Sequence, residues 1–201
     1  SAEVTATPDK VVETPDDTPP ATPTGLTADF TGPDLYLSWA PVDRAVRYRV
    51  RISDANGVRR ERHVSGSSYT YTLADNRADG SPAQPSLTVQ VWAQTQEGVY
   101  STTPATITAI NPPPTQPTAV AESSLTQIRW RITSDLPPDF RQVKVTVGTY
   151  TVSVPAASGV INLRDAGIDD GAQADLSFVI IDVFGQESDP YETNVQGHSV
   201  S

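Results

Sequence analysis

The 201-residue sequence contains no cysteine, no methionine, only two histidines and no long apolar run. Without cysteine, no disulfide can staple the fold and no thiolate can act as a nucleophile or zinc ligand. The longest apolar runs, such as Phe178–Ile181, have the length of a strand and fall far short of the roughly twenty residues that a membrane helix needs. The sequence therefore predicts neither cysteine chemistry nor membrane insertion. The absence of methionine and of a signal-peptide pattern at the N-terminus indicates a piece of a longer protein.

Positive charge is scarce, with 14 basic residues against 24 acidic ones and a net charge of -10. Residues 1–18 hold one Lys and five acids, residues 19–111 hold eight Arg and eight acids, and residues 112–201 hold five basic and eleven acidic residues. Duplex nucleic acids require clustered positive charge to neutralise their phosphates. This distribution argues against a nucleic acid partner and favours a soluble surface module.

What the chain does contain is 18 prolines and 12 glycines among many β-favouring residues. This composition predicts an all-β fold of short strands punctuated by turns. The clearest strand is Leu35–Trp39, whose alternation puts Leu35, Leu37 and Trp39 on one face before Pro41 ends the ladder. Ile128–Trp130 has a comparable setting, so the chain is predicted to hold two copies of one unit.

The predicted organisation is a linker over residues 1–18, a first unit over 19–111 and a second unit over 112–201. Trp39 and Trp130 are separated by 91 positions, Gly98 and Gly185 by 87, and Pro23 and Pro117 by 94, which indicates duplication. The three prolines at 112–114 favour a stiff, extended spacer and a rod-like arrangement.

Local patterns in the first unit give further expectations. In Arg47–Ile52 the apolar residues face one way and three arginines the other. Asn56-Gly57 predicts a hairpin with positive φ at both central turn positions, which pairs Val58–Val64 with the preceding strand. Further segments are expected as follows: Tyr69–Leu73 and Leu87–Ala93 as strands, and Asp75–Pro85 as a polar loop.

The first unit carries a set of marker residues: Pro20, Pro23, Leu26, Trp39, Tyr48, the alternating Leu87, Val89, Val91 and Ala93, and Gly98 followed by Ser101. In these residues it resembles a fibronectin type III domain. The second unit shares Trp130 and the Asp182-x-x-Gly185-x-x-Ser188 turn. The resemblance implies two immunoglobulin-like sandwiches of seven strands. In this family a tyrosine usually opens the sixth strand, and its hydroxyl forms a hydrogen bond that holds the preceding corner. Leu87 stands at this position in the first unit, and Ala174 or Leu176 in the second. The resemblance therefore does not extend to this hydrogen bond.

The segments Glu3–Ala6 and Lys10–Glu13 are similar to the region that joins the tail-hub body to type III domains in host specificity proteins of lambda-like tailed phages. This resemblance implies a non-enzymatic module of the phage tail tip, in the virion, that spaces or presents receptor-contacting parts. Its implied partners are other tail-tip proteins and a bacterial outer-surface receptor, with a homotrimer only in the full-length parent. The alternative is a type III spacer of a secreted bacterial carbohydrate-active enzyme or adhesin.

No catalytic, metal or cofactor site is predicted. His63 and His198 have no Ser or carboxylate at catalytic spacing, and both are interpreted as surface residues. Asp165, Asp169 and Asp170 lack the alternating spacing of a calcium loop, so an acidic turn is the simpler interpretation.

Seven arginines gather between Arg44 and Arg62, and Arg47, Arg49 and Arg51 are expected on one outer sheet face. They are candidates for contact with phosphate or sugar-acid groups of a cell surface. The favoured alternative is a solvated face balanced by the acids of the same unit. Trp92 is also predicted to point outward, stacked on Arg49 or Arg51. A carbohydrate-binding module would need more exposed aromatics than Trp92 and Tyr36.

Overall fold

The computed structural model describes residues 17–169 and 171–196. Most of the predicted linker, the Glu3–Glu13 segment, Asp170 and His198 lie outside the described residues. The N-terminal half contains β1 (Thr27–Thr31), β2 (Asp34–Ser38), β3 (Arg47–Asp54), β4 (Gly57–Val64), β5 (Ser68–Tyr71), α1 (Leu73–Ala78), β6 (Ser86–Gln94) and β7 (Ala105–Ile110). The C-terminal half contains β8 (Ala119–Ser123), β9 (Gln127–Ile132), β10 (Phe140–Val147), β11 (Tyr150–Val154), β12 (Ser158–Asn162), β13 (Ala174–Asp182) and β14 (Tyr191–Val195).

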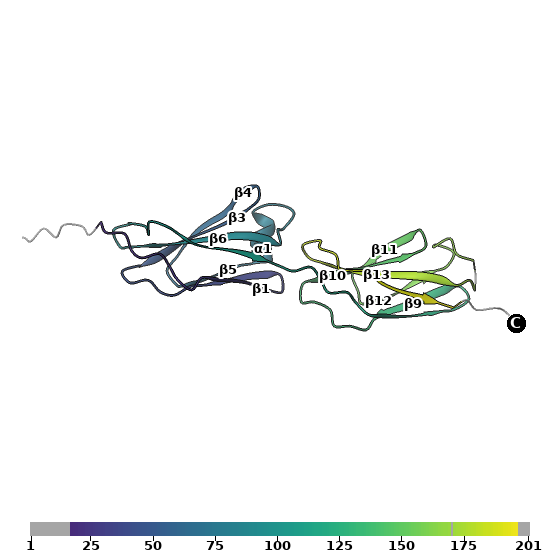
Figure 1. Ribbon diagram of the computed structural model, residues 1–201. Coiled ribbons are helices and arrows are strands. Elements are labelled where there is room, and N and C mark those ends of the chain that lie inside the picture. The colour runs from purple at the N-terminus through teal and green to yellow at the C-terminus, as the bar shows by residue number, and fades with distance from the viewer. Residues whose placement is uncertain (1–16, 170, 197–201) are drawn as a thin grey trace, which may run out of the picture.

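These strands form two antiparallel β-sandwiches with the same topology. In the N-terminal sandwich a three-stranded sheet, β1-β2-β5, faces a four-stranded sheet, β4-β3-β6-β7. The C-terminal sandwich repeats this order with β8-β9-β12 and β11-β10-β13-β14. In both, the fourth strand pairs with the third, whereas in an immunoglobulin constant domain it belongs to the opposite sheet. Figure 1 shows the two sandwiches lying end to end, and the predicted all-β fold of two tandem sandwiches is confirmed.

Each sandwich has its own hydrophobic core, and the two cores share no residue. Leu35, Leu37 and Trp39 are all buried, as the alternation predicts. Trp39 packs edge-on against Tyr48 with ring centroids 5.3 Å apart, and Trp130 packs against Phe178 at 5.7 Å. The period-2 pattern therefore identifies the inner face of each sheet correctly, since successive side chains of a strand alternate between its faces.

Two local predictions in the N-terminal sandwich are wrong. The helix α1 begins at Leu73 and covers the first part of the segment Asp75–Pro85 that was expected to be a polar loop, and the strand expected over Tyr69–Leu73 ends at Tyr71. Thr72 caps this helix: its hydroxyl accepts a hydrogen bond from the Asp75 amide, and the Asp75 carboxylate accepts from the Thr72 amide. This reciprocal capping box satisfies two amides at the helix N-terminus and fixes where the helix begins.

The hairpin between β3 and β4 forms, but its turn differs from the prediction. Asp54 pairs with Gly57, so the central turn residues are Ala55 and Asn56, and positive φ occurs only at Gly57. A register shift follows, because Ile52 pairs with Arg60 while Ser53 pairs with Val58. Arg59 is the extra residue of this β-bulge, a feature that re-aims side chains.

The bulge sends Arg59 and Arg60 into separate polar networks. Arg59 donates to Asp54 at 2.7 Å and to the carbonyl oxygens of Asn76 and Gly80, both at 2.7 Å. Arg60 makes a two-point contact with Asp79 at 2.6 and 2.8 Å and also bonds Asp75. These contacts fasten α1 and the loop after it to the sheet edge.

The two sandwiches meet through a polar junction formed by Asn111, Asp139, Asp182 and Gln186. The Asn111 amide nitrogen donates to Asp139 at 2.9 Å, and the Gln186 amide nitrogen donates to the Asn111 carbonyl at 3.0 Å. Asn111, Asp139 and Asp182 are all buried. Beside this junction, Phe30 of the N-terminal sandwich packs edge-on against Phe184, with ring centroids 5.7 Å apart.

Candidate functional site on the outer sheet face

The candidate site lies on the face of the β4-β3-β6-β7 sheet that points away from the core. Arg49 pairs with Trp92 and with His63 in adjacent strands, so these three side chains form one row across the face. Arg51 and Glu61 form the next row, and Arg47 with Gln94 the row on the other side. This pairing confirms the predicted register. Val50 and Val91 pair as a buried row, so the residues on either side of them in each strand point outward.

Arg49 and Arg51 stack with Trp92, as predicted. The guanidinium carbon Cζ of Arg49 lies 4.2 Å from the centroid of the Trp92 ring, and that of Arg51 lies 5.2 Å from it. The Arg49 guanidinium also lies over Tyr100, at 4.4 Å. We call these four side chains the arginine–aromatic stack. The negative ring faces attract the guanidinium charge and hold it in place.

The three outward arginines differ in how their charge is balanced. Arg51 forms a salt bridge with Glu61 at 2.8 Å. Arg47 donates from Nε to the neutral Gln94 side chain at 2.6 Å. Within the described part of the chain, no carboxylate pairs with Arg47 or Arg49. The expectation that acids of the same unit balance the arginines thus holds for Arg51, Arg59 and Arg60.

Sequence reasoning did not find Tyr100. It belongs to the turn after β6, where its backbone forms an isolated antiparallel β-bridge with Gln94. Its hydroxyl lies 2.8 Å from His63 Nε2. The signal available was the turn Thr95–Ser101, in which Ser101 Oγ accepts from the Ala93 amide at 3.2 Å. This bond returns the chain beside β6 and brings Tyr100 to the outer face.

The C-terminal sandwich has a different set of side chains at the same positions. There Lys144 pairs with Val179, as Arg49 pairs with Trp92. Glu187 bridges to Ile181, as Tyr100 bridges to Gln94. Lys144 Nζ forms a salt bridge with Glu187 at 2.5 Å. The lysine charge is therefore balanced by a carboxylate of its own domain.

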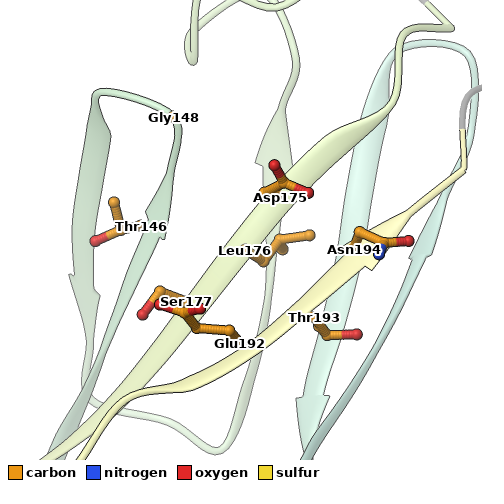
Figure 2. Close-up of a pocket in the computed structure, with 8 residues that line it drawn as sticks. All are labelled: Thr146, Gly148, Asp175, Leu176, Ser177, Glu192, Thr193 and Asn194. Carbon is orange, nitrogen blue, oxygen red and sulfur yellow. The ribbon is translucent and has the colours of Figure 1, made fainter.

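A second candidate is an open hollow of about 550 Å³ on the C-terminal sandwich. Figure 2 shows Thr146 from β10, Asp175 and Ser177 from β13, and Glu192 from β14 along its lining. Its lining contains two carboxylates and no basic side chain. No group of three His, Cys, Asp or Glu side chains among the described residues is placed to hold a metal ion. No described helix is long and apolar enough to cross a bilayer.

No family model and no curated protein matches this chain. Among solved structures, a two-domain fibronectin type III segment of chicken tenascin is 18% identical with a TM-score of 0.47, covering 87% of this chain and 98% of that chain. The FN1–FN3 domains of chicken CNTN1 are 15% identical with a TM-score of 0.37, covering 90% and 69%. An Fn3-like protein from Clostridium thermocellum is 24% identical with a TM-score of 0.36, covering 47% and 96%. The fold assignment rests on the strand pairing described above.

Proposed function

We propose that this chain is a non-catalytic spacer that holds two β-sandwiches in a fixed end-to-end arrangement. The observation that carries the proposal is the polar junction between the sandwiches. Asp182 accepts hydrogen bonds from the amides of Phe184 and Gln186 at 2.9 and 2.8 Å. These bonds fix the turn after β13, whose Gln186 side chain donates to the Asn111 carbonyl. A buried, hydrogen-bonded junction is costly to open, because each separated polar group must find another partner.

Beside the polar junction, the β1–β2 turn of the N-terminal sandwich also lies close to Pro138 of the C-terminal sandwich. A Cβ built on Gly32, in the β1–β2 turn, would lie 3.3 Å from Cβ of Pro138 in the C-terminal sandwich. Gly32 has φ of 60°, a conformation that glycine adopts without strain. The β1–β2 turn therefore fits closely against the next sandwich, which favours a restricted range of angles.

Residual dipolar couplings of the two-domain chain test the spacer proposal. We expect the two sandwiches to share one alignment tensor. The variants Asn111→Ala and Phe184→Ala should give two different tensors, whereas Asn194→Ala, an exposed amide on β14, should leave the shared tensor unchanged. Different tensors in the unmodified chain would contradict the proposal.

For the biological context we propose the tail tip of a lambda-like tailed phage, as part of a host specificity protein. The support is the similarity of residues 3–13 to the segment that precedes type III domains in that family. Mass spectrometry and antibody labelling of purified virions test this context, together with the sequence of the whole gene. A tail-hub domain upstream and labelling at the tail tip are expected. A signal peptide with a glycosidase domain would instead identify the secreted-enzyme alternative.

A further inference from the structure

The arginine–aromatic stack holds one guanidinium in a defined position without neutralising it. Arg49 contacts the rings of both Trp92 and Tyr100. Its Nε is buried and has no hydrogen-bond partner, so the rings and strands cover that side of the group. The side chain as a whole is still partly exposed. The two Nη nitrogens at the tip are therefore the part of Arg49 that can donate to a ligand.

Arg47 adds a second cation beside this tip. It lies two residues before Arg49 on the same face of β3, a separation of about 7 Å along the strand. Its Nε is used by Gln94, and its side chain is exposed. Arg51, on the other side, is already paired with Glu61. The uncompensated charge on this face is thus concentrated at Arg47 and Arg49.

The C-terminal sandwich indicates what such a position binds. Where the N-terminal sandwich has Tyr100 beside Arg49, the C-terminal sandwich has Glu187 bonded to Lys144. The same geometry therefore brings a carboxylate against the cation of the third strand. In the N-terminal sandwich the position holds a ring, which attracts the cation but carries no net charge.

We propose that Arg49, assisted by Arg47, binds an oxyanion, such as the carboxylate of a sugar acid or a phosphate group. A guanidinium offers paired N–H donors that match the two oxygens of either group. Since the rings already fix the orientation of Arg49, binding immobilises fewer rotamers of this side chain. This site is independent of the spacer function, because it does not involve the junction between the sandwiches.

Nuclear magnetic resonance of the intact two-domain chain tests the site, with glucuronate and inorganic phosphate as probes at constant ionic strength. The Nε–H signals of Arg49 and the indole signal of Trp92 should shift saturably at millimolar ligand. The amides of Lys144 and Val179 should not shift, which provides a control within one spectrum. Saturation by glucuronate or by phosphate supports the site, and the tighter of the two identifies the source of the oxyanion.

Two variants separate binding from folding. Tyr100→Glu places a carboxylate beside Arg49, as Glu187 lies beside Lys144 in the C-terminal sandwich, and should abolish the saturable shift. Arg49→Lys keeps the charge but loses the paired donors, and should weaken binding at least fivefold. Arg62→Lys, an exposed arginine of β4 outside the stack, serves as the matched control and should bind as the unmodified chain does. Equal shifts with chloride alone, or unchanged binding in Tyr100→Glu, would overturn the proposal.

Discussion

The two sandwiches have the same strand order and equivalent buried tryptophans, yet their outer sheet faces are built differently. The N-terminal face stacks Arg49 on aromatic rings, and the C-terminal face pairs Lys144 with Glu187. Core positions are restricted by packing on both sides, because a buried side chain must fill a space of defined shape. Outer positions must only stabilise the charge that they present. The comparison therefore separates what the fold requires from what each domain has added.

The largest expected effect concerns the positions that the two sandwiches share. Trp39→Ala should destabilise the N-terminal sandwich by about 3–5 kcal/mol, and Trp130→Ala the C-terminal sandwich by a similar amount, since each removes a large buried aromatic. Urea denaturation followed by resolved amide signals of each sandwich measures both. Trp39→Phe and Trp130→Phe should cost less, because neither indole Nε1 has a hydrogen-bond partner to lose. A loss below about 1 kcal/mol in either alanine variant would show that its tryptophan is not a core residue.

The next effect is specific to the C-terminal sandwich. Gly159 pairs with Trp130, and a Cβ at this position would lie 2.7 Å from the Trp130 ring. Gly159→Ala should therefore destabilise this sandwich by about 1–3 kcal/mol, the usual cost of overpacking. Gly66→Ala in the N-terminal sandwich is the matched control, because its Cβ would meet no atom within 4 Å. The same denaturation experiment compares the two, and equal effects would contradict the packing argument.

A third prediction is specific to the N-terminal sandwich and depends on pH. The hydrogen bond from Arg59 lowers the pKa of Asp54 below its ordinary value. A lowered folded-state pKa contributes stability above the unfolded pKa and loses it as the pH falls through the folded value. Asp54→Asn should cost about 1–3 kcal/mol at pH 7, since the salt bridge to Arg59 is nearly buried.

The difference between Asp54→Asn and the unmodified chain should begin to shrink as the pH falls below about 4, where Asp54 of the unfolded chain takes up a proton, and it should keep shrinking until the pH passes the lowered folded-state pKa. Thermal unfolding at pH 7 and at pH 3 measures this difference. Asp29→Asn, at an exposed aspartate of β1, is the control and should be close to neutral at both pH values. A constant difference across this range would show that the carboxylate charge does not stabilise the fold.

Sequence patterns predicted the parts of this molecule that depend on alternation. Inward apolar residues fixed the register, and the register then placed Trp92 beside Arg49. The helix α1 was missed because its signal is a capping box around Thr72, within a stretch whose polar composition also suits a loop. Tyr100 was missed because its place depends on a turn that returns the chain to β6, a tertiary contact without a period in the sequence. The direction of Arg59 depends on a bulge, which shifts alternation by one residue.

The smallest expected effect tests the difference between the two outer faces directly. Glu187→Gln should destabilise the C-terminal sandwich by less than about 1 kcal/mol in low salt, because the pair is exposed to solvent. This cost should vanish in about 1 M NaCl, where the Debye length is about 3 Å. Arg49→Gln should cost the N-terminal sandwich roughly 0.5–1 kcal/mol. Most of that cost should persist in high salt, since ring contact at 4.2 Å leaves little room for ions. Denaturation in low and high salt measures both variants. If the two costs fell equally with salt, Arg49 would be held by a charge attraction that salt screens, as Lys144 is held by Glu187, and the two faces would not differ in kind.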